Sequence, residues 1–364
     1  MNKLKRILAT LLVIILCSSG LMAQGFGLPS KKFGLGFGNL PTFTGIRINP
    51  VDKDVNKLIG INITAWQPSS FDVQTGSFYG LGLGLPTAMG TENRYGVSLA
   101  LFGVGATETI AGINLAGLAV GGNNAYGVNL GGLAAGAGEN LYGLNIGGLA
   151  AGAGENVAGL NIGGLAVGAG KSLSGISASL LGVGAGENII GITVGGLAAG
   201  SGKSMTGLNI GGLAVGAGEK LVGLNIGGLA VGAGEEVKGI NLSVVAIGSG
   251  ATLAGFNLAG LAVAAPKVKG ISTALIVGGT EVTGISLAPA YFRIKQVGSD
   301  GTPTMKGVSI SAFNHIQGVQ KGLAIGIFNY AHKVKGVQLG LLNYNRSNPK
   351  GLRWLPIFNA GFGG

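Results

Sequence analysis

Cysteine, histidine, aromatic residues and charged residues are all scarce in this chain of 364 residues. It holds one cysteine, two histidines, 6% aromatic residues and 10% charged residues. A charge content this low, beside 47% hydrophobic residues, excludes a chain kept unfolded by its own charge. The single cysteine, Cys17, lies in the apolar start of the chain, so the remainder has no disulfide and must be stabilised by packing.

The first 23 residues have the pattern of an export signal. Three cations among residues 3–6 precede an apolar run over residues 7–17, and small residues lead to a cleavage point after Ala23. Leu16 is a poor residue before a lipidated cysteine, so lipid attachment at Cys17 is disfavoured. The pattern predicts an exported protein at the cell surface or outer membrane of a Gram-negative-type bacterium.

Glycine, in contrast, is abundant and regular. It supplies 75 residues, and the glycines that open successive units lie sixteen residues apart from Gly127 to Gly255. Collagen is excluded because no three-residue period exists. Helix is disfavoured because each glycine costs a helix roughly 1 kcal/mol relative to alanine. The period predicts a stack of similar units.

The apolar residues of one unit predict two short strands. Leu160 and Ile162 share one strand face, and Leu165 and Val167 share a face in the opposite phase. This change of phase predicts a corner at Gly163-Gly164, and a second corner falls at the following Gly-Lys-Ser. Two strands and two corners predict one closed coil, with a thin core of glycine, alanine and valine.

Two all-β architectures fit a repeat of this length. One is a parallel β-solenoid with about 16 residues per coil, and the alternative is a transmembrane antiparallel β-barrel with one strand per repeat. Parallel stacking would alternate opposite charges in the turns, whereas antiparallel strands would gather like charges on one rim. The turn residues are, in order, Glu139, Glu155, Lys171, Glu187, Lys203, Glu219 and Glu235.

An asparagine at one place in the unit also favours the solenoid. Stacked in parallel, these side chains can form an amide ladder, with Asn145, Asn161 and Asn209 on one line. A barrel would instead need aromatic girdles, and residues 143–255 contain no aromatic residue. The recurring asparagines are Asn129, Asn145, Asn161, Asn209, Asn225, Asn241 and Asn257.

The repeat pattern divides the chain into four regions. Within them we expect a loose lead-in over residues 24–39, a loop over residues 67–79 and a turn at Gly298–Gly301, with Trp354 and Phe358 closing the end. The regions are a signal peptide (1–23), an N-terminal β cap with divergent repeats (24–95), regular glycine-rich repeats (96–283) and C-terminal repeats with FNY and LNY units (284–364) that contain an insertion (291–306).

Basic residues gather in the C-terminal part. From Lys267 onward there are eleven basic residues against Glu281 and Asp300, whereas residues 121–266 hold four lysines and six glutamates. This predicts an anionic partner surface, such as lipid head groups or polysaccharide. The alternative is ordinary solvated lysines in repeat turns. Nucleic acid is not expected, because aromatic and basic residues are not interleaved.

No motif has the spacing of a catalytic or cofactor-binding site. Gly-Lys-Ser occurs at 170–172 and 202–204, but leucine (Leu165 and Leu197) replaces the glycine that a phosphate-binding loop requires. The dinucleotide spacing GxGxxG, begun at Gly152, ends on Val157. We therefore expect no enzyme and no cofactor.

No metal site is expected either. The turns lack the aspartates of calcium-binding β-rolls. His315 and His332 occupy nearly corresponding places in adjacent units, but they have no neighbouring carboxylate or cysteine in the sequence. Asp300 is the only aspartate beyond Asp72, so a Ser-His-Asp triad is poorly supported.

Both flanks resemble a bacterial surface-repeat family of spirochaetes and Bacteroidetes-type bacteria, whose repeats read like KGVQIGLINY. The resemblance implies an exported or surface protein of undefined biochemical role, with no catalytic residues. The central units are similar, in architecture, to the β-roll heads of trimeric adhesins. The segments that carry the family resemblance are Gly45–Trp66, Lys321–Val334, Lys335–Asn345 and Lys350–Ala360.

Three functions follow as hypotheses. The first is a non-enzymatic structural or adhesive protein of the cell envelope or surface. The second is an outer-membrane β-barrel protein or pore. The third is a secreted solenoid that binds glycans or ice, which the lack of regular threonine rows disfavours.

Overall fold

The computed structural model describes residues 25–66, 74–296 and 302–361. The expected signal segment, the expected turn at Gly298–Gly301 and residues 67–73 of the expected loop lie outside these ranges. The expectation of a loop is wrong for residues 77–79, which are part of a strand. The chain divides into two compact units, Met1–Gly170 and Lys171–Gly364. Among the described residues, no helix is long and apolar enough to cross a membrane.

The first unit is a parallel stack of strands that opens with a hairpin. Strands β1 and β2 pair antiparallel, and β2 then pairs in parallel with β3. The expectation of a loose lead-in is therefore wrong for residues 26–37. The strands are β1 (Phe26–Pro29), β2 (Phe33–Phe37), β3 (Thr42–Asn49), β4 (Lys57–Thr64), β5 (Ser77–Gly84), β6 (Thr87–Ala88), β7 (Asn93–Ala100), β8 (Gly103–Gly105), β9 (Thr109–Ala116), β10 (Ala119–Gly131), β11 (Ala134–Gly147), β12 (Ala150–Ala153), β13 (Asn156–Gly163) and β14 (Ala166–Ala169).

The second unit repeats this arrangement and ends in an antiparallel strand. Its elements are β15 (Ser172–Ser179), β16 (Gly182–Ala185), β17 (Asn188–Gly195), β18 (Ala198–Ser201), β19 (Ser204–Gly211), β20 (Ala214–Ala217), β21 (Lys220–Gly227), β22 (Ala230–Ala233), β23 (Glu236–Ser243), β24 (Ala246–Ser249), β25 (Thr252–Ala259), β26 (Ala262–Ala264), β27 (Lys267–Thr273), β28 (Ile276–Gly279), β29 (Glu281–Ile294), β30 (Thr304–Asn345), the 3-10 helix η1 (Lys350–Leu352) and β31 (Trp354–Ala360). β31 pairs antiparallel with β30, and it carries the expected closing residues Trp354 and Phe358.

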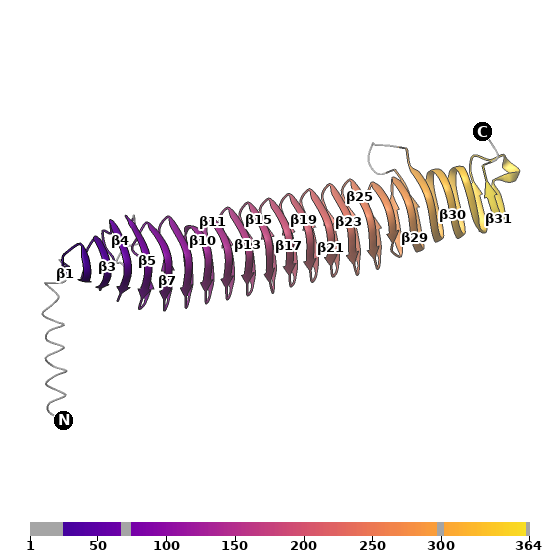
Figure 1. Ribbon diagram of the computed structural model, residues 1–364. Helices are drawn as coiled ribbons and strands as arrows, with labels where there is room; N and C mark the ends of the chain where they lie inside the picture. Colours follow the sequence, from indigo (N-terminus) through magenta and orange to yellow (C-terminus); the bar gives the residue numbers. More distant parts are fainter. Residues whose placement is uncertain (1–24, 67–73, 297–301, 362–364) are drawn as a thin grey trace, which may run out of the picture. The chain divides into compact units, whose positions relative to one another are not determined.

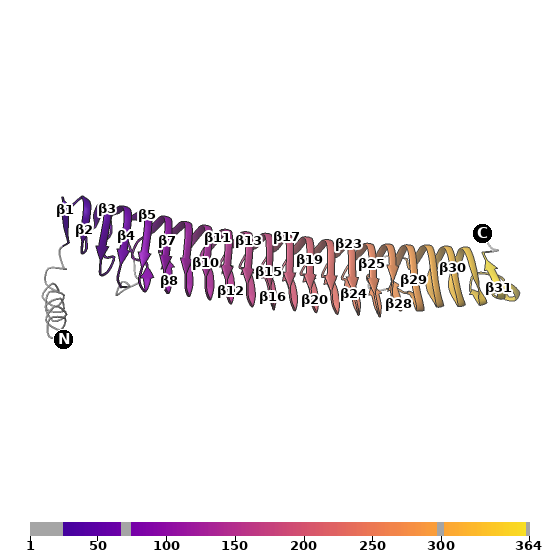
Figure 2. The same cartoon turned by 60° about the horizontal axis from the view of Figure 1, so that its bottom comes forward.

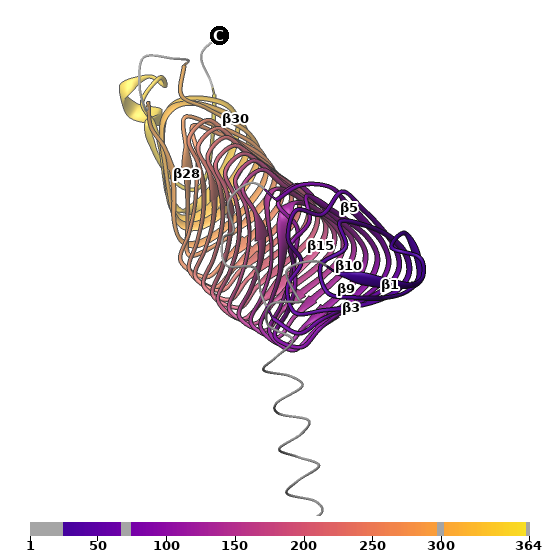
Figure 3. The ribbon, with the colours of Figure 1, turned by 90° about the vertical axis from the view of Figure 1, so that its left-hand side faces the viewer.

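Neighbouring coils pair in parallel with each residue over its counterpart in the next coil. Asn145 lies over Asn161 in the first unit, and Asn209 over Asn225 in the second. Successive strands of a unit lie side by side in Figure 1, and its coils lie over one another when viewed along the stack in Figure 3. The parallel β-solenoid with coils of about sixteen residues is confirmed. The antiparallel barrel is wrong, because these ladders are parallel.

Each regular coil consists of a long strand, a bend, a short strand and a second bend. In the second unit β19 has eight residues and β20 has four. Figure 2 shows short strands such as β16 and β20 beside the long ones. The bend expected at Gly163-Gly164 does follow β13, at residues 164–165.

The change of phase from which this bend was predicted is nevertheless absent. Leu160 and Ile162 point outward, with 39% and 37% of each residue exposed, and Asn161 between them is fully buried. Val167 points inward at 2% exposure, while Leu165 lies at the bend with 43% exposed. Leu165 and Val167 therefore do not share a face, and no phase change was needed to bury Val167.

The core is filled by larger side chains than glycine, alanine and valine alone. In the second unit the long strands contribute one inward column and the short strands another, and each buried side chain adds roughly 1.5–3 kcal/mol. The long-strand column includes Leu173, Ile189, Met205, Leu221, Val237 and Leu253, and the short-strand column includes Val183, Val215, Val231, Ile247 and Val263, all at most 3% exposed.

Candidate interaction surface

The long strands turn two rows of large apolar residues outward. Alternation along β13 and its counterparts buries the asparagine and exposes the residue on each side of it. We call these two outward rows the lateral apolar face of a unit. In the first unit they comprise Leu35, Ile46, Ile61, Leu81, Val97, Ile113, Val128, Leu144 and Leu160, beside Phe37, Ile48, Ile63, Leu83, Leu99, Leu115, Leu130, Ile146 and Ile162.

The second unit has the same face. Only Ala178 and Thr273 interrupt its large apolar residues, and neither row contains a charge. Its rows are Ile176, Ile192, Leu208, Leu224, Ile240, Phe256, Ile271, Ile285 and Val308, beside Ala178, Val194, Ile210, Ile226, Leu242, Leu258, Thr273, Leu287 and Ile310.

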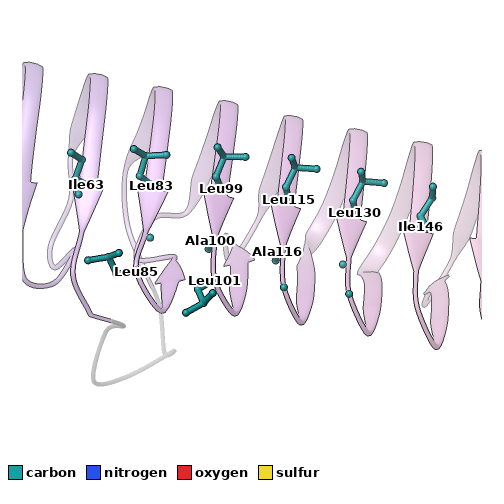
Figure 4. Close-up of a pocket in the computed structure, with 14 residues that line it drawn as sticks. Ile63, Leu83, Leu85, Leu99, Ala100, Leu101, Leu115, Ala116, Leu130 and Ile146 are labelled. Atoms are coloured by element: carbon teal, nitrogen blue, oxygen red, sulfur yellow. The ribbon is translucent and has the colours of Figure 1, made fainter.

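In the first unit the lateral apolar face borders a groove. The groove has a volume of about 750 Å³ and is lined on one side by the row that includes Leu83, Leu99 and Leu115. Leu85 and Leu101 stand near its opposite side in Figure 4. The row of leucines passes from coil to coil without a polar side chain between them, so the groove is apolar along its length.

The second unit has a larger groove among its C-terminal coils. Its volume is about 960 Å³, and its lining includes Leu287, Ile310, Ile325 and Leu339. Leu287 and Ile310 belong to the lateral apolar face, so this groove too runs along the outward rows. Both grooves are open surface features rather than enclosed cavities.

The charged turn residues lie apart from this face, at the bend that follows the short strand. Lys203 Nζ lies 3.1 Å from Glu187 Oε2, with 51% and 41% of the side chains exposed. This pair confirms one step of the expected alternation of charges, although a pair this exposed contributes at most about 1 kcal/mol. Lys203 also belongs to the second Gly-Lys-Ser sequence, which is thus an ordinary repeat turn.

The asparagines form ladders inside the coils. In the first unit the amide Nδ2 of each asparagine donates to Oδ1 of the next at 2.8–3.0 Å, from Asn114 to Asn161. In the second unit a like ladder runs from Asn209 to Asn257 at 2.8–2.9 Å and ends on Ser272. The predicted ladder is confirmed, but it is an internal feature rather than a surface one.

A buried cluster of two arginines and one aspartate was not predicted. Arg47 occupies the asparagine place of its coil and pairs with Asp52, which also accepts hydrogen bonds from Asn62 and Thr64 at 2.9 Å. Arg94 lies 3.9 Å from Asp52. All three charged residues are at most 1% exposed.

Arg94 is the member of this cluster whose hydrogen-bond donors are poorly paired. Its Nε and Nη1 have no hydrogen-bond partner, and its guanidinium lies 4.8 Å from the centroid of the Phe78 ring. Burial lowers the pKa of Arg94 to about 10, against the opposing effect of Asp52. Gly82 makes room for it, since a side chain there would meet Nη1. The cluster fits a structural role in the interior of these coils.

Aromatic residues form columns on the C-terminal coils. The rings of Phe313 and Phe328 stack at 4.9 Å, and Trp354 continues this stack at 5.8 Å from Phe328. A second column stacks Tyr330 on Tyr344 at 5.1 Å.

The two histidines lie beside these aromatic columns. His315 Nδ1 lies 2.7 Å from the Tyr291 hydroxyl, and burial lowers the pKa of His315. His332 is edge-on to Tyr330, 5.6 Å between centroids. The described residues contain no group of three or more histidine, cysteine, aspartate or glutamate side chains placed to hold a metal.

Comparisons with known proteins add no relative. No family model, no curated protein and no solved structure matches the chain. The resemblance of the flanks to the surface-repeat family therefore stays a prediction, and function must be argued from the surface itself.

Proposed function

We propose that this chain is an exported, non-enzymatic structural protein of the bacterial cell envelope, and that it works through its lateral apolar face. The observation that carries the proposal is the outward position of Leu160, Ile162 and their counterparts in every regular coil. A typical monomer exposes a largest apolar patch of about 300–600 Å². The rows exceed that size within one unit: in the second unit nine row residues, Ile192 and Phe256 among them, are 36–48% exposed, and the other large apolar residues of the rows are half-buried.

The regular pattern of these rows differs from the scattered leucines that ordinary protein surfaces tolerate. Single exposed apolar residues are common on soluble proteins. Here polar side chains such as Asn161 and Asn257 are buried, while the large apolar residues on either side of them are exposed. An arrangement repeated this regularly suits a protein whose outer face contacts another apolar surface.

Fractionation of the native bacterium tests this function. We expect the chain in the envelope fraction, retained there through a high-salt wash. Lysines at Ile192, Ile240 and Phe256 should release it, because charges would enter the apolar contact. The matched control places lysines at Ala198, Ala246 and Ala262, which face outward from the short strands of the same coils. Recovery of the unaltered chain in the cytosol, or equal retention of both variants, would contradict the proposal.

We further propose that the basic C-terminal coils bind an anionic surface. Lys321, Lys335 and Lys350 are exposed, and positive charge attracts anionic head groups within roughly a Debye length. The chain should co-sediment with vesicles that contain an anionic phospholipid, more strongly at low salt. Glutamine at these three lysines should weaken binding. Glutamine at Lys203, Lys220 and Lys238 is the control, and an equal loss there would contradict a C-terminal site.

A further inference from the structure

We infer that the lateral apolar face binds the same face of a second copy of this chain. The inference deepens the proposed function, on which it rests, by naming the partner. Three features of the face support it: its area, its surroundings and its period.

The area is sufficient for a stable dimer. In the second unit sixteen of the eighteen residues in the two rows are large and apolar. Nine of them, such as Ile192, Ile240 and Phe256, are 36–48% exposed and the other seven are half-buried, so together they present on the order of 1,000 Å² of apolar surface. A standard interface buries about 800 Å² per partner. The first unit, whose eighteen row residues are all large and apolar, reaches a similar area by itself.

The surroundings of the face match the anatomy of a protein interface. Interfaces have an apolar centre and a polar rim. In the second unit the outward position two residues before the first row is polar in six of nine coils and apolar in three, so it forms a mixed, mainly polar rim. The polar residues are Ser174, Thr206, Lys238, Lys269, Thr283 and Lys306, and the apolar ones are Ile190, Val222 and Ala254.

The period of the face selects a second copy. Parallel strands repeat about every 4.8 Å, so the rows form regular ridges of leucine and isoleucine. Another copy of this chain presents ridges with the same spacing, which allows side chains of the two faces to interdigitate over many coils. A two-fold axis lets one patch serve both partners, and such an assembly closes at a dimer.

Each unit has one end that does not offer a comparable surface. In the first unit the short β1–β2 hairpin, which contains Pro29, covers the first coil. In the second unit β31 pairs antiparallel over the last coil, from Val337 to Tyr344. Capped ends disfavour growth by strand addition, so association through the sides of the coils is favoured.

Sedimentation velocity of the full chain without detergent tests the inference. We expect a dimer, and we expect lysines at Ile192, Ile240 and Phe256 to raise its dissociation constant roughly 100-fold or more, because they bury unpaired charge. Lysines at Ala198, Ala246 and Ala262 should leave the dimer intact. If the lysine variant fails to fold by circular dichroism, serine at the same three positions replaces it, with a smaller but still measurable loss of dimer.

Three outcomes would overturn the inference. They are a monomeric unaltered chain at all concentrations, a dimer that survives both face variants, and a monomer that instead pellets with uncharged phosphatidylcholine vesicles. The last result would assign the face to lipid. A monomeric chain whose lysine variant is still released from the envelope would leave the proposed function standing and remove only the self-association.

Discussion

At the scale of single residues, the residue between the two outward rows decides how well each coil hydrogen-bonds to its neighbours through buried side chains. Asparagine there donates to one neighbour and accepts from the other, as Asn225 does between Asn209 and Asn241. Threonine at the same place breaks the ladder. Thr193 lies over Asn209 but does not hydrogen-bond to it, and Asn209 Oδ1 is buried without a partner.

Thr193→Asn should therefore stabilise the protein. The new amide can donate to Asn209 Oδ1, and a hydrogen bond made by a buried, previously unpaired group contributes about 1 kcal/mol. The thermal unfolding midpoint should rise. Thr193→Val, similar in shape but without a donor, should show no such gain. An asparagine variant less stable than the valine variant would show that the ladder does not extend this way.

The buried charges give a second residue-scale prediction. Asp52→Asn leaves Arg47 and Arg94 buried without a counter-ion and should cost about 3–5 kcal/mol. Arg94→Met should be neutral or stabilising. The folded pKa of Arg94, about 10, lies below its unfolded value, so the charged group costs stability at neutral pH. Chemical denaturation of both variants at pH 7 provides the comparison, and a larger loss for Arg94→Met would refute this assignment.

At the scale of the element, a glycine in the middle of each long strand permits the close stacking of coils. Gly207 has φ of 125°, and a Cβ on it would overlap the carbonyl oxygen of Gly191 in the coil before. Gly216, in the short strand, has ordinary space around it, since its nearest neighbour would be 3.6 Å from a Cβ. Glycines at these two places therefore serve different purposes.

Alanine substitution separates these two glycines. Gly207→Ala should lower stability by at least about 2 kcal/mol, because both the backbone conformation and the space are unsuitable for a side chain. Gly216→Ala should change stability by less than about 1 kcal/mol. Thermal unfolding of both variants tests this, and equal effects would show that the long-strand glycine is not a special position.

The elements also show how far the sequence could be interpreted. The repeating unit follows from the sixteen-residue spacing. The parallel stacking is favoured over an antiparallel barrel by the alternating turn charges and by the asparagines, whose ladder needs parallel coils. The spacing does not show which side chains of each strand point into the coil and which point outward. Alternation alone cannot distinguish a coil with Leu160 and Ile162 inside from one with Asn161 inside, and the usual preference for buried leucine suggests the wrong choice.

The N-terminal coils show a second limit. Arg47 occupies the asparagine place of its coil, so its inward position could have been recognised once the orientation of the strand was known. Its partner Asp52 comes from the segment after β3, outside any repeat, and Arg94 comes from β7. Contacts that join different places in the unit have no periodic signal.

At the scale of the whole molecule, the same arrangement recurs in both units: the asparagine amides point inward, and the leucine and isoleucine residues on either side of them point outward. Buried asparagines are tolerated because the ladders satisfy their amides within each coil stack. The outward rows lose contact with water only if another surface covers them. Stability of the coils and association of the chain therefore depend on different residues, which alternate along the same strands.

Two neighbouring residues of β21 provide the most direct test of this reversal. Leu224→Asp and Asn225→Asp should be compared by thermal unfolding in solutions dilute enough for a monomer. Asn225 is fully buried and donates to Asn241 Oδ1 at 2.8 Å, so its replacement by a carboxylate should cost about 3–5 kcal/mol. Leu224→Asp should cost less, about 1–2 kcal/mol, because Leu224 is half-buried in an outward row. If Leu224→Asp proves the more destabilising change, the leucines are inside and the account is wrong.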